Sequence, residues 1–250
     1  MSPPFNGLVP LLVMDLGLGG RVAIVTGASK GLGFGAAKAL AGEGVKLVLC
    51  ARDAERLEAT AGELATETAT VAADVTDPDT PAKLVETAIE HFGGLHVLVA
   101  NAGGPPQARA LEVDDEGMRA AVEANMLTSI RLVQAAVPHM REAGWGRICL
   151  ITSYAVKQPI PTLAYSNAAR AGLWAWAKTA AQDLVEDDIT LNLACPRLHA
   201  TDRVKELGAA GRLGDPEDFG KVVAFLCSHP AGFVSGAALQ IDGAATIGLL

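Results

Sequence analysis

The sequence contains no hydrophobic run long enough to span a bilayer, so we expect no membrane-crossing segment. It also lacks an excess of positive charge, because 20 Lys and Arg residues stand against 28 Asp and Glu residues, a formal net charge of −8. This balance argues against a broadly basic face for nucleic acid or an anionic membrane. A local basic pocket for a phosphorylated ligand remains compatible with it. We expect a soluble, cytoplasmic protein.

Metal-binding and disulfide patterns are missing as well. The four cysteines, Cys50, Cys149, Cys195 and Cys227, are far apart and do not have the spacing of metal ligands. Three of them fall in or just after strand-like runs, and the fourth falls near an expected helix end. We therefore predict buried free thiols, a reducing compartment and no metal site.

No linker-like or low-complexity stretch divides the chain. Residues 1–13 include a short apolar piece, but a proline interrupts it and no basic residue precedes it, which makes a poor signal peptide. We expect residues 1–13 to be a flexible leader and residues 14–250 to form one domain. Half of the residues are apolar and only 19% are charged, a composition that suits a buried parallel sheet.

The sequence does show a regular alternation of strand-like and helix-like segments. Strands are expected at 21–26, 45–51, 68–73, 95–100, 146–152, 189–195 and 237–241. Helices are expected at 31–43, 53–65, 79–92, 114–142, 163–186 and 215–228. This alternation predicts an α/β fold, a doubly wound parallel sheet of about seven strands with helices on both faces.

A glycine-rich stretch separates the first expected strand from the first expected helix. Glycines let a ligand approach the backbone closely, and the unpaired amides of a first helical turn favour an anion. Ordinary strand-to-helix turns are also glycine-rich, so the spacing alone leaves both interpretations open. The residues expected to hold a diphosphate here are Gly27, Ser29, Lys30, Gly31, Leu32 and Gly33.

In folds of this type, ligands bind at the carboxyl ends of the strands. The second strand ends at Ala51 and is followed by Arg52, where an acidic residue would bind an adenosine ribose hydroxyl. Arg52 and Lys30 together favour a ribose 2′-phosphate, and therefore NADP over NAD. The alternative is that Arg52 and Asp53 are solvated charges at the start of the next helix.

Two further strand ends carry weaker signals. Asp74 follows the third strand and can bind an adenine amino group, and the turn Asn101–Gly104 follows the fourth and can lie against a ribose. Each is equally compatible with a helix cap or a turn.

In combination, these motifs resemble those of the short-chain dehydrogenase/reductase family from Leu16 to Gly243. The matching residues are Thr26–Gly33, Asp74, Val75, Asn101, Ala102, Gly103, Asn125, Ser129, Ser153, Pro196, Thr201 and Ile241–Gly243. The segment Gly211–Asp218 resembles the bacterial 3-oxoacyl-(acyl-carrier-protein) reductase-like branch. This resemblance implies a single Rossmann-type domain that assembles as a homotetramer or a dimer.

The resemblance also implies the chemistry. Family members bind a nicotinamide cofactor, here NADP(H) with NAD(H) as the less favoured option, and transfer a hydride between it and a ketone or alcohol. A 3-oxoacyl thioester is one candidate substrate. The residues that it assigns to cofactor binding, besides the glycine turn and Arg52, are Asp74, Val75, Asn101, Ala102, Gly103, Arg170, Pro196 and Thr201.

The family's catalytic set is an Asn, a Ser, a Tyr acid/base and a Lys four residues after the Tyr. Asn125 matches the Asn and Ser153 matches the Ser, but the residue four after Tyr165 is Ala169. Aligning Arg170 with the family's Lys instead puts Ser166 at the Tyr position. Ser166 and Arg170 share a helix face.

Tyr165 and Arg170 diverge by about 140° on a regular helix and can cooperate only if a π-bulge intervenes. Three hypotheses follow. The first is an active reductase whose acid is Tyr165, Tyr154 or water. The second is weak turnover, with Ser153 and Ser166 positioning the substrate. The third is a dinucleotide-binding protein with weak or no conventional reductase activity.

The segment near 197–213 is expected to form a short substrate lid. Pro196 is followed by Arg197 where the family usually has Gly, and only nine residues separate Thr201 from Gly211. His199 can face the pocket from this segment. The short lid predicts an open pocket, and the substrate cannot be named from it.

Overall fold

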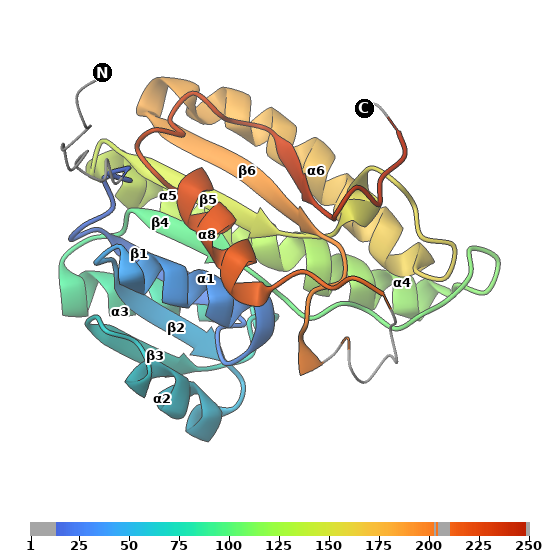
Figure 1. Cartoon of the computed structure of the whole chain (residues 1–250), viewed down its shortest axis with the longest axis horizontal. Coiled ribbons are helices and arrows are strands. Elements are labelled where there is room, and N and C mark those ends of the chain that lie inside the picture. Colours follow the sequence, from blue (N-terminus) through green and yellow to red (C-terminus); the bar gives the residue numbers. More distant parts are fainter. Residues whose placement is uncertain (1–13, 203, 205–210, 249–250) are drawn as a thin grey trace, which may run out of the picture.

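The computed structural model describes residues 14–202, 204 and 211–248. Its strands form one parallel seven-stranded sheet in the order β3-β2-β1-β4-β5-β6-β7 (Figure 1), which confirms the predicted architecture. The strands are β1 (Val22–Thr26), β2 (Lys46–Ala51), β3 (Thr68–Ala72), β4 (Val97–Ala100), β5 (Gly146–Ile151), β6 (Ile189–Pro196) and β7 (Ala238–Ile241).

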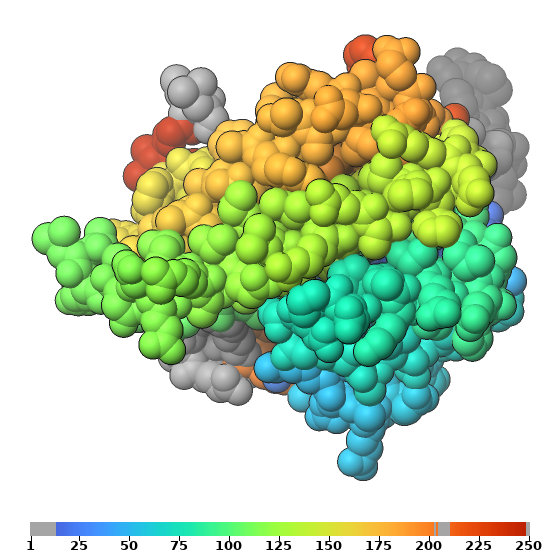
Figure 2. Space-filling model, turned by 180° about the vertical axis from the view of Figure 1, so that it is seen from behind, coloured from blue at the N-terminus to red at the C-terminus, as the bar shows by residue number. Residues whose placement is uncertain are grey.

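Helices cover both faces of this sheet, and each face has its own apolar core. Side chains alternate along a strand, so Ala23 and Val25 of β1 pack in one core, whereas Val22 and Ile24 pack in the other. Helices α1 (Gly31–Gly42), α2 (Ala54–Gly62) and α8 (Pro216–Leu226) lie over the first core. Helices α3 (Thr80–Phe92), α5 (Thr128–Glu142) and α6 (Ala164–Leu184) lie side by side over the second (Figure 2). The sheet is therefore buried on both sides.

Aspartates begin three of the helices near the positions expected from the sequence. Asp53 caps α2, Asp114 caps α4 (Asp115–Val122) and Asp215 caps α8, each accepting a backbone N–H of the first turn. Such caps satisfy amides that have no partner inside the helix. Two short 3₁₀ turns are also present, η2 (Tyr154–Val156) and η3 (Val185–Asp187).

The helix expected at 114–142 is continuous but not uniform. A π-helical turn, η1 (Glu123–Leu127), joins α4 to α5. The Thr128 amide donates to the Glu123 carbonyl five residues earlier, and the Thr128 hydroxyl donates to the same oxygen at 2.9 Å. This wide turn contains Asn125.

All four cysteines are free and buried, as predicted. Burial raises the pKa of the Cys50 and Cys195 thiols to about 11, so both are protonated at neutral pH. They behave as small core residues rather than as nucleophiles.

Two predicted segments lie outside the described residues: the leader at 1–13, and positions 203 and 205–210 of the lid. Among the helices that the structure describes, none is long and apolar enough to cross a membrane. Within the same ranges, no group of His, Cys, Asp and Glu side chains is arranged to hold a metal ion.

Candidate active site

The glycine turn after β1 is packed so tightly that its glycines cannot be replaced without movement. Gly27 has a φ of 60°, which favours glycine, and its carbonyl accepts the Asn101 Nδ2–H at 3.3 Å. A Cβ on Gly33 would lie 2.2 Å from that same carbonyl oxygen. Gly33 therefore brings the start of α1 against the turn and exposes the first amides of the helix at the carboxyl edge of the sheet.

Two cavities open along this edge, and they share the residues of the turn after β4. Cavity A, of about 660 Å³, lies beyond β1, β2 and β3 and is lined by Arg52, Asp74 and Val75. Cavity B, of about 640 Å³, lies beyond β5 and β6 and is lined by Ser153, Ser166 and Arg170. Residues common to both walls are Lys30, Asn101, Ala102, Gly103 and Gly104. Together the cavities form one trough across the point where the strand order reverses.

Cavity A is lined by several charged groups. Lys30, Arg52 and Arg56 lie on its wall with Asp53 and Asp74. Hydrogen bonds from the backbone and hydroxyl of Thr76 lower the pKa of Asp74, and the charge of Arg52 lowers it further. Asp74 thus forms a turn, as one interpretation of its sequence position predicts, and also lies on the cavity wall.

Arg56 was missed in the sequence analysis. It lies four residues after Arg52, and its guanidinium Nε donates to the Ser29 carbonyl at 3.2 Å. The sequence contains a signal for Arg56, because residues four apart project in similar directions from the start of a helix, so Arg56 is expected on the same side as Arg52.

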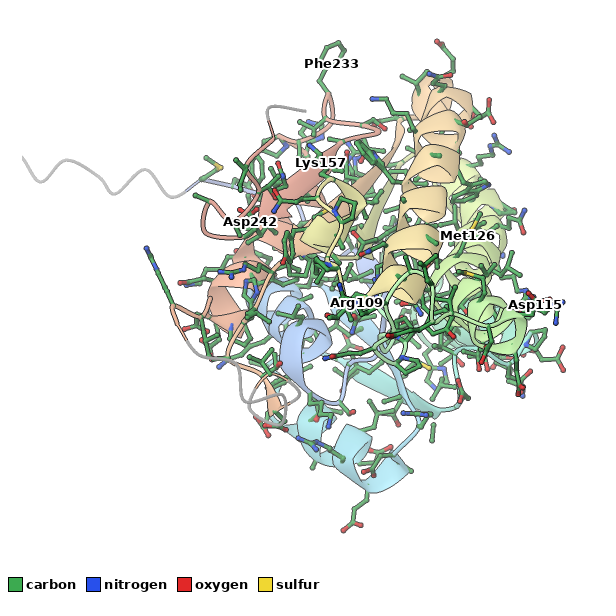
Figure 3. All side chains as sticks on the ribbon, turned by 90° about the vertical axis from the view of Figure 1, so that its right-hand side faces the viewer. Arg109, Asp115, Met126, Lys157, Phe233 and Asp242 are labelled. Carbon is green, nitrogen blue, oxygen red and sulfur yellow. The ribbon has the colours of Figure 1, made fainter. Side chains whose placement is uncertain are left out.

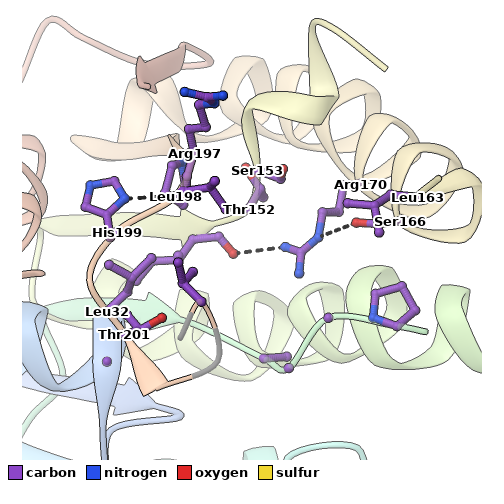
Figure 4. A pocket seen from close by; sticks show the side chains of 18 of the residues that line it. Leu32, Thr152, Ser153, Leu163, Ser166, Arg170, Arg197, Leu198, His199 and Thr201 are labelled. Carbon is purple, nitrogen blue, oxygen red and sulfur yellow. Dashed lines mark hydrogen bonds between the residues drawn. The ribbon is translucent and has the colours of Figure 1, made fainter. Parts of the chain in front are cut away.

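A hydrogen-bonded pair from α6 lines cavity B (Figure 4). Arg170 Nε donates to Ser166 Oγ at 3.1 Å, and its Nη1 donates to the Ile151 carbonyl at 3.3 Å. Arg170 is only 7% exposed. The guanidinium is therefore held against the end of β5, and the predicted proximity of Ser166 and Arg170 is confirmed.

Ser153 stands at the end of β5 on the wall of cavity B, where its Oγ accepts the Ala155 amide at 3.1 Å. Its hydroxyl hydrogen remains available to a ligand oxygen, because this bond uses only a lone pair.

Asn125 is buried in the π-turn, outside the walls of both cavities. Neither its amide nitrogen nor its amide oxygen has a hydrogen-bond partner among the described residues. A buried amide in this state requires a water or ligand partner to avoid a desolvation penalty.

Tyr165 lies on a different side of α6. Its hydroxyl accepts the Asp114 amide at 3.0 Å, and a Cβ on Gly117 would lie 2.5 Å from that oxygen. The adjacent Asp115 opens α4 at the outer edge of the molecule (Figure 3). Helix α6 is regular from Ala164 onward, so the bulge that would bring Tyr165 to Arg170 is absent and that expectation is wrong. The structure gives Tyr165 a tie between α6 and α4 and no position on either cavity.

The end of β6 and the segment after it line one side of cavity B, through Pro196, Leu198, His199 and Thr201. The Thr201 side chain packs near Gly31, where a Cβ would lie 3.3 Å from Thr201 Cγ2. Arg197 is exposed and points away from Arg170 (Figure 4). His199 lies on the cavity wall, but its ring packs edge-on against Phe219.

Comparison with known proteins decides the family. Residues 27–246 match the family model described as enoyl-(acyl carrier protein) reductase. The chain belongs to the short-chain dehydrogenase/reductase family. This is an oxidoreductase family, and the resemblance seen in the glycine turn and strand ends is confirmed.

Named relatives within the family are reductases. The chain is 30% identical over 239 residues to the 3-oxoacyl-[acyl-carrier-protein] reductase FabG of Vibrio cholerae, covering 91% of this chain and 98% of the relative. It is 32% identical over 236 residues to the 3-oxoacyl-[acyl-carrier-protein] reductase of Synechocystis, with coverages of 89% and 96%.

Solved structures of the family superimpose closely on this one. L-sorbose reductase from Gluconobacter frateurii, complexed with NADPH and L-sorbose, matches with a TM-score of 0.88 at 31% identity, covering 94% of this chain and all of that one (100%). YwfH, an NADPH-dependent reductase involved in bacilysin biosynthesis, matches with a TM-score of 0.87 at 25% identity, with coverages of 92% and 99%.

His199 makes stability in this short-chain dehydrogenase/reductase sensitive to acid. It is 5% exposed, and burial lowers its pKa below the usual 6.5. The unfolded chain therefore binds a proton at a higher pH than the folded one, and the free energy of unfolding should fall as pH drops below about 6.5, by at most about 1.4 kcal/mol per pH unit. His96 contributes in the same direction. Urea unfolding at pH 7.5 and 5.5 should show a smaller loss for His199→Gln than for the wild type, and equal losses would contradict this account.

Proposed function

We propose that this protein is an NADP(H)-dependent oxidoreductase that reduces a ketone, or oxidises the corresponding alcohol, by hydride transfer. The observation that carries the proposal is the single trough formed by cavities A and B, joined at the Asn101–Gly104 turn. Its two ends differ in chemistry. Cavity A offers cations and backbone amides, whereas cavity B offers hydroxyls and one buried guanidinium within a largely apolar wall.

The residues of cavity A fit a phosphorylated dinucleotide. Gly27 and Gly33 let the turn pack directly against the first turn of α1, where helix amides suit a diphosphate. Lys30, Arg52 and Arg56 supply positive charge for a ribose 2′-phosphate. When bound, the cofactor supplies or accepts the hydride. Two solved relatives, one in complex with NADPH and one an NADPH-dependent reductase, support the same choice.

In cavity B, Ser153 and Ser166 present hydroxyls to the carbonyl oxygen of the substrate. Arg170 is charged at every working pH and stabilises the negative charge that develops on that oxygen. Neither serine is a good acid, since an aliphatic hydroxyl lacks the phenol pKa of about 10. The proton therefore comes from Tyr154 on the cavity wall or from water. The partnerless amide of Asn125 is suited to hold a buried water of its own, outside the wall of cavity B.

The Ser166–Arg170 hydrogen bond also favours a second candidate function. A protein that binds the dinucleotide but turns over slowly, or not at all, would show this pair where the family places Tyr and Lys. The two functions share cavity A and differ only in what cavity B does.

The test combines binding and turnover. NADPH binding is followed by nicotinamide fluorescence, and NADPH consumption is followed with an acetoacetyl thioester and a panel of small diketones. Turnover that falls by about 10²-fold in Ser153→Ala supports the reductase. Binding without turnover on any carbonyl favours the second candidate, and no binding contradicts both. Loss of turnover in Tyr154→Phe would assign the proton to that residue.

Gly33→Ala should weaken NADPH binding about tenfold or more, because its methyl group would force the turn away from the helix. Gly42→Ala is the matched control, since a Cβ at this other end of α1 meets nothing within 4 Å. The Kd for NADPH is measured for both variants by fluorescence titration. Equal affinities would show that the tight packing of the turn does not serve the cofactor.

The substrate class and the assembly are proposed from the relatives. A 3-oxoacyl thioester is the first substrate to test, because relatives at about 30% identity carry that name. We further propose a cytoplasmic homotetramer, with a dimer as the alternative. Light scattering at micromolar concentration checks the assembly, and a monomer would contradict it.

A further inference from the structure

Arg56 joins three parts of the molecule at the cofactor end. Its Nε donates to the Ser29 carbonyl in the glycine turn, and its Nη2 lies 3.2 Å from Asp202 Oδ2 in the segment after β6. Thr60, one turn further along α2, donates its hydroxyl to the same Ser29 carbonyl at 3.2 Å. In Figure 1 the orange segment after β6 reaches down toward the blue region of α1 and β2. Helix α2 is thus tied to both the glycine turn and this segment.

The Arg56–Asp202 ion pair is well suited to exchange partners. The side chains are 46% and 47% exposed, and ion pairs of this exposure contribute little to stability. Arg56 also lines cavity A beside Lys30 and Arg52. A phosphate dianion accepts two parallel bonds from a guanidinium, which makes it a stronger partner than an exposed carboxylate.

We propose that Arg56 sets the preference for NADP(H) over NAD(H) by moving from Asp202 to the adenosine 2′-phosphate. The inference rests on the proposed function, because it assumes a dinucleotide in cavity A. Asp202 then competes with the phosphate for Arg56, and by linkage the phosphate loosens the hold of α2 on Asp202. Asp202 directly follows Thr201, which lines cavity B. Whether the bound cofactor carries a 2′-phosphate therefore affects the segment that lines cavity B.

Arg56→Gln tests the specificity. Its Kd for NADPH and for adenosine 2′,5′-bisphosphate should rise about tenfold, whereas its Kd for NADH and for AMP should change less than twofold. Fluorescence titration gives the Kd values for NADPH and NADH, and calorimetry gives those for adenosine 2′,5′-bisphosphate and AMP. Lys38→Gln is the matched control, because Lys38 forms a similarly exposed pair with Glu217 at 2.5 Å and does not line cavity A. It should leave all four constants unchanged.

Asp202→Asn tests the competition. It should tighten NADPH binding about two- to fivefold, and the gain should vanish when Arg56→Gln is already present. Glu217→Gln removes the same charge elsewhere and should have no effect. An additive gain in the double variant would overturn the shared-partner account.

Two other results separate this inference from the proposed function. If Arg56→Gln weakens the binding of NADH and NADPH equally, Arg56 serves only to hold the glycine turn. That result would overturn this inference but not the proposed function. Wild-type protein that binds neither dinucleotide would overturn the proposed function as well.

Discussion

Replacing Ser166 by Tyr and Arg170 by Lys in one variant is expected to raise kcat for carbonyl reduction by about 10²-fold or more, the contribution of a positioned general acid. Ser166 lines cavity B and is hydrogen-bonded to Arg170 one turn along α6. A phenol at 166 would extend into the cavity toward Ser153. A Lys at 170 would carry its charge on a flexible stem and lower the pKa of that phenol.

The measurement is NADPH consumption under saturating carbonyl, with the Kd for NADPH as a check that the cofactor end is intact. Tyr165→Phe is the matched control, because its phenol lies one residue away on the same helix but is bonded to Asp114. It should change kcat by less than about threefold, while the lost hydrogen bond lowers the free energy of unfolding by about 1 kcal/mol. If Tyr165→Phe abolishes turnover, or if the double variant gains nothing while still binding NADPH, the placement of the reaction in cavity B is contradicted.

Arg147→Met is expected to lower the free energy of unfolding by about 3–5 kcal/mol. Arg147 is 1% exposed and lies in β5, near the amino end of the sheet. Its Nη1 donates to the Gly146 and Asp188 carbonyls at 2.8 and 2.7 Å, and its Nε donates to the Ser228 carbonyl at 3.2 Å. Its guanidinium carbon also lies 4.3 Å from the centre of the Trp145 ring. Removing it takes a donor from the buried Gly146 and Ser228 carbonyls and leaves the Asp188 carbonyl with only the Gly146 amide.

Arg141→Met is the control for this prediction. Arg141 Nε pairs with Asp187 Oδ2 at 2.7 Å, but the Arg141 side chain is half exposed. Its loss should lower the free energy of unfolding by no more than about 1 kcal/mol. Urea denaturation followed by tryptophan fluorescence and circular dichroism gives both values. Similar losses for the two variants would show that burial of Arg147 adds nothing to an ordinary surface pair.

Much of the fold is predictable because its determinants are local. Apolar runs such as Val22–Val25 fill a strand that is buried on both faces, and an aspartate before a helix, as at Asp53, marks where the helix begins. The helix at 114–142 was predicted as one uniform element. Its π-turn was missed because a carbonyl shared by two groups of Thr128 leaves no pattern in apolar spacing.

The candidate site was predictable where residues share one helix face or follow one strand. Ser166 and Arg170 meet because they are four apart, and Lys30 and Arg52 line one cavity because β1 and β2 are parallel neighbours. The fate of Tyr165 was not predictable, since its partner Asp114 is 51 residues away and the space for its ring depends on Gly117.

Spacing along the chain therefore specifies which residues lie at the carboxyl edge of the sheet, because all parallel strands end at the same edge, independently of loop conformation. It also specifies that no Tyr and Lys stand four apart on the helix beyond Ser153. Contacts between distant segments decided the rest. The Gly27–Gly33 approach, the junction of the two cavities at Asn101 and the Arg56–Asp202 pair each join side chains or backbones that only the packed sheet brings within reach.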